Sequence, residues 1–133
     1  MANAEPEESG TEDSEEDPPD PRRGEIWRVE FDPTVGSEIR KARPAATISS
    51  DAVGTLPIRL VVPFTGWRSH FEGNLWHVQI PSTEQNGLDK KSAADALQVR
   101  SVDTARFTEK LGRMHPPRLE EIVTAVALVI EYR

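Results

Sequence analysis

The feature that most constrains the fold is a set of short, strand-like segments that end at turn residues. The best of them spans residues 58–64, where β-branched and other apolar residues follow one another. Further segments of strand character lie at residues 25–31, 44–49 and 75–80. Residues typical of turns separate them at 32–36, 51–57 and 65–70. The chain therefore predicts a small sheet of short strands.

The last third of the chain predicts one more strand and one helix. Residues 93–100 fit either a helix or a strand, and we predict a strand over 96–100 because residues 98–102 continue in β character. A short helical turn is expected near residues 104–107. Pro116 and Pro117 suit the first turn of a helix. Its apolar residues share one face: Leu119, Ile122, Val123, Val126, Val129 and Ile130. These elements predict a mainly β fold, a small antiparallel barrel with a C-terminal α-helix.

The first 20 residues differ from the rest in charge. They contain nine acidic residues and no Lys or Arg, and they end in the proline-rich run Pro18-Pro19-Asp20-Pro21. Such a segment buries too little apolar surface to offset its ordering entropy. We expect a disordered acidic tail over residues 1–21 and one folded domain over 22–133. The whole chain has net charge −7 from 16 basic and 23 acidic residues, so the remainder carries 16 basic and 14 acidic residues. That slightly basic balance is compatible with RNA binding.

Composition excludes several classes of site. The chain has no cysteine, which excludes disulfides and cysteine zinc sites. His70, His77 and His115 show no metal-ligand spacing. No apolar run reaches the roughly 18–20 residues of a membrane span, and the start of the chain lacks the pattern of a secretion signal. We expect a soluble cytoplasmic protein that needs no metal and no other cofactor.

Residues 36–43 form the first candidate for chemistry. This loop places three cations within four positions, beside an acid and a glycine: Arg40, Lys41, Arg43, Glu38 and Gly36. Glycine allows close approach of a ligand to the backbone, and arginine forks bind phosphate. The loop would cradle a phosphate and offer a carboxylate as base. The alternative is an ordinary solvated loop whose charges pair with one another.

The end of the strand at 58–64 is the second candidate. Thr65 is followed by a glycine, so its hydroxyl could donate to a phosphate oxygen. Trp67 could stack on an unpaired base, and Arg68 would add charge. The alternative is a strand-terminating threonine with Trp67 covering the barrel mouth. His70 is either a general acid or base or an exposed loop residue. For Trp27 and Trp76 we expect core packing.

Taken together, these segments resemble the MazF/PemK family of toxins. The resemblance rests on three stretches before residue 46 and two after it. They are Arg23-Gly24-Glu25-Ile26-Trp27, then Phe31-Asp32-Pro33-Thr34-Val35-Gly36-Ser37-Glu38, Arg43-Pro44-Ala45, Val62-Pro63-Phe64-Thr65, and Leu97-Gln98-Val99-Arg100-Ser101-Val102-Asp103. The resemblance covers about residues 22–131, nearly the whole predicted domain.

The resemblance implies a type II toxin on an SH3-like β-barrel. Such a protein is a homodimer that is bound by an acidic, MazE-like antitoxin. It cuts single-stranded RNA sequence-selectively without a metal, leaving a 2′,3′-cyclic phosphate and a 5′-hydroxyl. Arg43 and Thr65 match the expected catalytic pair, and Glu38 matches the loop glutamate. The expected RNA-binding residues are Gly36, Ser37, Arg40, Lys41, Trp67, Arg68, His70 and Gln98.

The roles of these residues are less determined than their positions. Arginine is a poor base because its pKa is above about 12. We therefore expect Arg43 to stabilise the phosphorane and to protonate the leaving oxygen, and Thr65 to donate to a non-bridging oxygen. The proton acceptor is left open between Glu38, Arg43 in an unusual state, and water.

One departure from the family pattern leaves two other functions open. Many relatives carry an acidic residue where this chain has Leu97, and Asp95 lies two residues away. The first alternative is a non-catalytic toxin on the same fold, of the kind that poisons DNA gyrase. The second is an inactive binder of antitoxin or RNA. The acidic tail adds a further hypothesis, self-inhibition by occupying the RNA groove, against a merely solubilising role.

Overall fold

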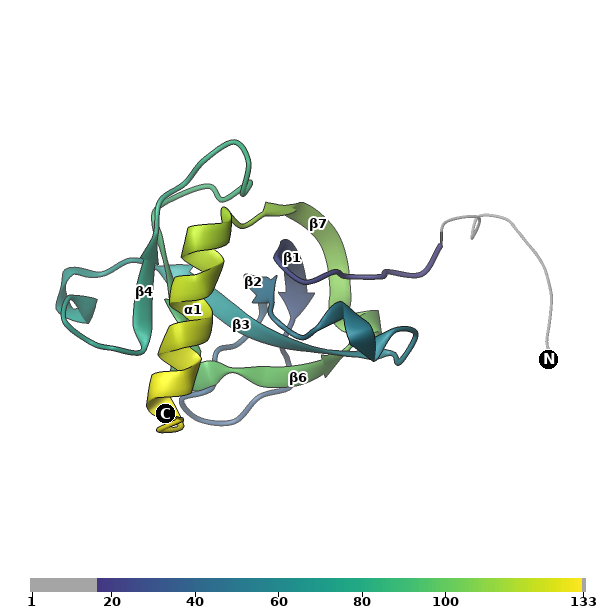
Figure 1. Cartoon of the computed structure of the whole chain (residues 1–133), viewed down its shortest axis with the longest axis horizontal. Helices are drawn as coiled ribbons and strands as arrows, with labels where there is room; N and C mark the ends of the chain where they lie inside the picture. Colours follow the sequence, from purple (N-terminus) through teal and green to yellow (C-terminus); the bar gives the residue numbers. More distant parts are fainter. Residues whose placement is uncertain (1–16, 133) are drawn as a thin grey trace.

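The computed structural model describes residues 17–132, which form a curved antiparallel sheet and a C-terminal helix (Figure 1). Within them the strands are β1 (Glu25–Glu30), β2 (Ala42–Thr47), β3 (Ile58–Gly66), β4 (His77–Ile80), β5 (Ser92–Asp95), β6 (Arg100–Asp103) and β7 (Phe107–Arg113), and the helix is α1 (Pro116–Val129). The strand order is β4-β5-β3-β2-β1-β7, and β6 also pairs with β3. The strands curve as in a barrel, although β4 and β7 end the sheet. The predicted mainly β fold with a C-terminal helix is confirmed.

Strand β3 is the centre of the sheet because it pairs with three neighbours. It runs against β2 around Val62, against β6 from Ile58 to Val61, and against β5 from Phe64 to Gly66. Pro63 lies between the parts that pair with β6 and with β5. Proline has no N–H to donate to a strand ladder, so it is tolerated where β3 changes from one partner strand to the next. The strand end at Thr65 is thus held by β5.

Two apolar clusters form the core. The larger packs the sheet against α1 and contains Ile26, Val62, Phe64, Ile80 and Ile122, each with at most 1% of its surface exposed. The smaller lies across the first strands and includes Val29, Phe31, Val61, Val102 and Phe107. Burying one such side chain contributes about 1.5–3 kcal/mol. Both clusters draw on β3, which explains why its long apolar run dominates the sequence pattern.

The predicted strand at residues 96–100 is wrong. Residues Ala96–Gln98 form a short 3-10 turn between β5 and β6. Its cause is Asp95, whose carboxylate accepts the backbone N–H of Leu97 at 3.1 Å. A short polar side chain that bonds the local backbone competes with a strand ladder. Strand β7 carried no clear alternation in the sequence, because it pairs with β1 alone and its central residues are exposed.

The predicted apolar face of α1 is largely confirmed. Ile122 and Ala125 are buried, and Leu119, Val123 and Val126 pack against the larger cluster. Ile130 lies beyond the end of the helix and is 66% exposed, so its assignment to this face was wrong. Within residues 17–132, no helix is long and apolar enough to cross a membrane.

Trp27 and Trp76 are half-buried rather than central in the core. Register shifts between β1 and β7 interrupt the alternation along β1, and Ile26 and Val29, three residues apart, are both buried. The ring of Trp27 packs edge-on against Phe107 at 5.8 Å. The two-residue periodicity of a regular strand could not place these side chains, because it takes no account of β-bulges.

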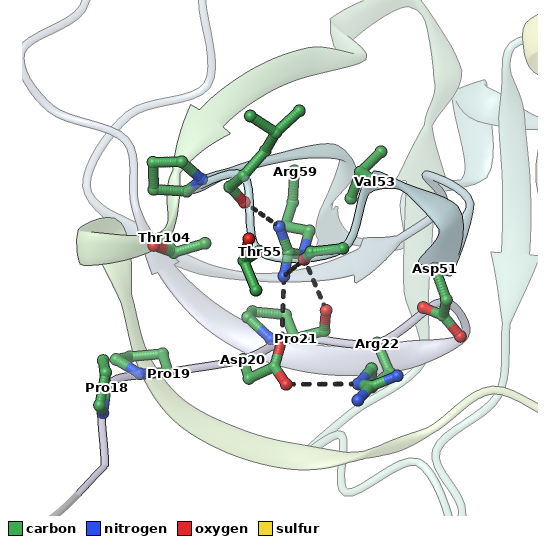
Figure 2. Close-up of a pocket in the computed structure, with 13 residues that line it drawn as sticks. Pro18, Pro19, Asp20, Pro21, Arg22, Asp51, Val53, Thr55, Arg59 and Thr104 are labelled. Atoms are coloured by element: carbon green, nitrogen blue, oxygen red, sulfur yellow. Dashed lines mark hydrogen bonds and ion pairs between the residues drawn. The ribbon is translucent and has the colours of Figure 1, made fainter.

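The predicted acidic tail lies mostly outside the described residues, but its last part is visible against the domain (Figure 2). Pro21 is fully buried, and its carbonyl accepts Nε of Arg59 at 2.9 Å. The carboxylate of Asp20 lies 3.0 Å from the same guanidinium. The chain therefore contacts the domain before residue 22, where the expected domain begins.

Candidate active site

Arg43 and Thr65 lie near each other, Arg43 close to the start of β2 and Thr65 close to the end of β3. The two strands pair with Ala45 opposite Pro63 and Ala46 opposite Val62. Arg43 and Thr65 each lie two residues beyond the last paired positions, and both line the same two concave surfaces. The structure therefore brings together the two residues for which the sequence predicts the catalytic roles.

A concave surface surrounds this pair. Its outer part encloses about 460 Å³. It is lined by Arg43, Thr65, Gly66, Trp67, Arg68, Lys90 and Lys91, which we call the basic groove. An inner hollow of about 200 Å³ shares Arg43, Thr65, Gly66 and Lys90 with it. Of the predicted RNA-binding residues, Trp67 and Arg68 thus lie beside the predicted catalytic pair.

The basic groove carries unbalanced positive charge. Its four cations are Arg43, Arg68, Lys90 and Lys91, and none of them makes an ion pair with a carboxylate of residues 17–132. Nε of Arg43 donates to the carbonyl of Arg40 at 3.0 Å, which orients the guanidinium. A hollow lined by one sign of charge concentrates ions of the opposite sign. Arginine forks in it match the oxygens of a phosphate.

Glu38 and Gln98 line a different hollow. It encloses about 380 Å³ between the loop after β1 and the turn before β6, and we call it the loop hollow. The carboxylate of Glu38 accepts the N–H of Val35 at 2.9 Å. The structure therefore does not bring Glu38 together with Arg43 and Thr65 in one cavity.

Gln98 clamps the loop that carries Glu38. Its Nε2 donates to the carbonyl of Ser37 at 2.9 Å, and its Oε1 accepts the N–H of Ile39 at 3.1 Å. The two hydrogen bonds bracket Glu38 on both sides along the chain. The amide predicted to contact RNA is thus engaged with the loop backbone.

The other predicted RNA-binding residues line neither cavity. Arg40 and Lys41 are exposed, and Lys41 has a positive φ of 69°. Gly36 is also exposed, with φ of 59°, a conformation that favours glycine. His70 is exposed and packs edge-on against Phe71 at 4.7 Å between ring centroids. Their roles stay predictions.

His77 and Asp95 form a half-buried pair next to the turn that carries Gln98. Nε2 of His77 lies 3.6 Å from the carboxylate of Asp95, and the His77 ring stacks on Phe71 at 3.8 Å. Burial lowers the pKa of His77, although Asp95 opposes the shift. Burial raises the pKa of Asp95, although His77 and the backbone amides of Leu97 and Gln98 oppose the shift. Asp95 thus anchors the turn from which Gln98 reaches the loop.

Sequence reasoning missed three basic residues that line the groove or its inner hollow. Lys90 and Lys91 come from the loop before β5, and Arg28 comes from β1. Arg28 differs from the lysines because it lies 3.5 Å from the carboxylate of Glu109. The Lys90-Lys91 pair was a visible signal, but only the pairing of β3 with β5 shows which strand end it approaches.

The pocket around Arg59 and the acidic and histidine side chains of the described residues provide no further candidate site. The pocket of about 410 Å³ in Figure 2 is built around Arg59, whose guanidinium already donates to Pro21, Leu56 and Asp20. Across residues 17–132, no three His, Cys, Asp or Glu side chains gather in a way that could hold a metal ion.

Comparison with known proteins matches residues 22–130 to a family described as PemK-like, MazF-like toxin of type II toxin-antitoxin system. Endoribonuclease MazF9 of Mycobacterium tuberculosis is 34% identical over 116 residues, which cover 83% of this chain and 96% of that protein. Endoribonuclease MazF of Staphylococcus saprophyticus is 30% identical over 106 residues, covering 79% and 87%.

Solved structures share the fold. MazF from Deinococcus radiodurans matches with a TM-score of 0.71 at 23% identity, covering 84% of this chain and 96% of that one. A mycobacterial endoribonuclease solved in complex with its cognate antitoxin matches with a TM-score of 0.68 at 18% identity, covering 86% and 98%. These likenesses establish the architecture in which Arg43 and Thr65 are placed.

Proposed function

This chain belongs to the PemK-like, MazF-like family of type II toxins, and we propose that it is an endoribonuclease that cuts single-stranded RNA. The single observation that carries this proposal is the placement of Arg43 beside Thr65 in the basic groove. A hydroxyl and a guanidinium that has no carboxylate partner among the described residues suit a phosphodiester in this groove. The relatives named as endoribonucleases give the reaction class.

The reaction that we propose uses the RNA's own 2′-hydroxyl as nucleophile. Its oxygen forms a bond to the adjacent phosphorus while the bond from phosphorus to the 5′-oxygen breaks. The 2′-hydroxyl proton passes to a base, and the leaving 5′-oxygen takes a proton from Arg43 or from water. The products are a 2′,3′-cyclic phosphate and a 5′-hydroxyl.

Arg43 and Thr65 act on the charge that develops in this step. The Arg43 guanidinium faces the non-bridging oxygens and stabilises the additional negative charge of the phosphorane. The Thr65 hydroxyl donates to one of the same oxygens, which holds the phosphate in line for attack. We propose that neither role requires a metal ion.

Trp67 and Arg68 extend the groove along the strand. The Trp67 ring packs edge-on against Phe71 at 5.7 Å, so it is held in place at the groove wall. A fixed aromatic face of this kind stacks on an unpaired base. Double-stranded RNA keeps its bases paired and stacked, so the proposal favours a single-stranded substrate.

The proton acceptor stays open between Glu38, Arg43 in an unusual state, and water. The carboxylate of Glu38 is held by the N–H of Val35 in the loop hollow. For Glu38 to take the proton, the loop would have to release this bond and move toward Arg43. The loop is therefore the part of the site whose geometry must change if Glu38 is the base.

Relatives also suggest the partners. Toxin–antitoxin complexes are among the similar solved structures. As a member of this toxin family, the chain has an antitoxin as its partner. We propose that the antitoxin is acidic and MazE-like, because the groove that it would block is basic. We also propose a homodimer that acts in the cytoplasm on cellular RNA.

Chimeric substrates test the proposal. An RNA oligonucleotide spanning a mapped cut is incubated with the purified full chain in EDTA, beside a copy with one 2′-O-methyl group at the cut position. We expect cleavage of the first and none of the second, because methylation removes the nucleophile. Cleavage of both would contradict the 2′-hydroxyl mechanism. Binding without cleavage of either, at any salt concentration, would favour the non-catalytic binder.

A further inference from the structure

Lys90 occupies a place in the groove that none of the sequence patterns assigned. It lines both the basic groove and the inner hollow, as Arg43 and Thr65 do. Lys91, its neighbour in sequence, lines the basic groove alone. A residue common to both cavities lies where they meet, which is also where the catalytic pair lies.

The Lys90 side chain runs directly over the residue after Thr65. A Cβ atom built on Gly66 would lie 3.3 Å from both Cε and Nζ of Lys90. That spacing is tighter than ordinary carbon contacts, so the ammonium stem uses the space that the glycine leaves open. The absence of a side chain at position 66 thus allows Lys90 to approach the end of β3.

Backbone contacts hold this arrangement. Gly66 pairs with Ser92 in the ladder between β3 and β5. The Ser92 hydroxyl donates to the carbonyl of Lys90 at 3.0 Å, and the N–H of Trp67 donates to the carbonyl of Lys91 at 3.1 Å. The segment that carries Lys90 is therefore tied to the end of β3 by the two residues that follow the lysine.

The Lys90 ammonium is also free to take an anion. Within residues 17–132 it makes no ion pair, whereas Arg28, which lines the same inner hollow, pairs with Glu109. Asp89 lines the inner hollow too, but no carboxylate oxygen of the described residues lies within 4.0 Å of Nζ. A compact ammonium at this position suits a single phosphate oxygen.

We infer that Lys90 is a further catalytic residue, which contacts a non-bridging oxygen of the scissile phosphate and stabilises its charge in the transition state. This inference rests on the proposed ribonuclease function. Lys90 forms and breaks no covalent bond in the step. It adds a point charge opposite the developing phosphorane, complementary to the planar fork of Arg43.

Neighbouring lysines make a matched experiment. The full-length wild type, Lys90→Ala, Lys90→Arg and Lys91→Ala are assayed in EDTA on the same RNA under single-turnover conditions. Lys90→Ala should lower the cleavage rate constant about 100-fold. Lys90→Arg should recover part of that loss, and Lys91→Ala should act mainly by weakening RNA binding. Thermal melts establish that the variants are folded.

A sulfur substitution reports the contact itself. Substrates with sulfur at one or the other non-bridging oxygen are cut at different rates when a cation contacts one oxygen only. We expect the wild type to discriminate between the two isomers and Lys90→Ala to lose part of that discrimination. Gly66→Ala should lower the rate about tenfold by displacing Lys90, with a smaller further loss on adding Lys90→Ala.

The outcomes separate the two claims. Cleavage by the wild type with a Lys90→Ala rate equal to that of Lys91→Ala, and with isomer discrimination intact, would overturn the role of Lys90 alone. No cleavage by the wild type in EDTA or in magnesium would overturn the proposed function, and the role of Lys90 with it.

Discussion

The basic groove and the loop hollow both carry residues with predicted catalytic roles, but the structure positions them by different means. In the groove, Arg43 on β2 and Thr65 on β3 line the same two cavities, and the four cations there have no carboxylate partner in the described chain. In the loop hollow, Glu38 depends on a loop that the Gln98 side chain holds by two hydrogen bonds.

The groove and the loop therefore differ in rigidity. Backbone pairing fixes both residues of the groove, because Arg43 pairs with Val29 of β1 and Thr65 pairs with Ala93 of β5. Two side-chain hydrogen bonds, each worth about 0.5–1.5 kcal/mol, support the loop. We therefore expect the groove to bind and stabilise the phosphate and the loop to adjust to the RNA.

The largest effect should follow from removing the guanidinium in the groove. Arg43→Ala should lower kcat about 1,000-fold, because it deletes the main charge facing the phosphorane. Glu38→Gln keeps an oxygen that can accept the N–H of Val35 and should cost only about tenfold. Steady-state kinetics of both variants on one RNA measure the comparison. Equal losses would show that Glu38 works directly on the reacting atoms, against the separation seen here.

The next effect concerns the loop clamp. Gln98→Ala should raise KM about tenfold and blur the choice of cut sites, because the loop loses both of its bonds to the side chain. Hydrogen exchange at the amide of Ile39 should become faster in the same variant. Gln79→Ala on β4, which lines neither cavity, is the matched control and should behave as wild type. Unchanged selectivity together with faster exchange would separate the loop from RNA recognition.

A smaller effect should come from the acidic N-terminal segment. Residues 1–16 contain seven acids, while Asp20 and Pro21 contact Arg59 and should be kept. Deleting residues 2–16 should raise activity about fivefold at low salt, with no difference at high salt, if the acids compete with RNA for the basic groove. A chain with those acids changed to amides should match the deletion. Activity that is equal with and without the segment at every salt concentration leaves only a solubilising role.

The smallest effect concerns the pH dependence of stability that arises from His77. The pKa of His77 is lowered in the folded protein, so the unfolded chain binds more protons just below the ordinary value of 6.5. Above pH 6.5, His77 is neutral in both states and does not reduce the free energy of unfolding. As the pH falls from 6.5 toward the lowered pKa of the folded protein, protonation of His77 in the unfolded chain reduces the free energy of unfolding. His77→Gln should reduce the fall in Tm between pH 7 and pH 5 by about 2 °C. His115 is exposed, so His115→Gln should leave the fall in Tm unchanged. An equal fall in Tm for both variants would contradict the role of His77.

Much of this could be predicted from the sequence, for reasons visible in particular residues. The run from Ile58 to Phe64 predicted the central strand because both faces of β3 meet apolar clusters. The family resemblance predicted Arg43 and Thr65 as a pair, and strand register is consistent with that pairing.

Other features could not be predicted because they depend on tertiary pairing. Lys90 had no assigned role, since only the β3–β5 ladder and the missing side chain of Gly66 bring it to the site. Gln98 was predicted as an RNA contact, and nothing in its spacing indicated that it would bond the backbone of the loop after β1. The turn at Ala96–Gln98 depended on one side chain, Asp95.

We propose that Arg43 and Thr65 form the centre of a ribonuclease that needs no metal. The most direct test incubates the purified full chain with a long single-stranded RNA in EDTA, beside Arg43→Ala and Thr65→Ala, and maps both ends of every cut. Discrete cuts that leave a 2′,3′-cyclic phosphate and a 5′-hydroxyl, and that disappear in both variants, are the predicted result. Cuts that persist in the variants, or that leave 5′-phosphates or require magnesium, would contradict it.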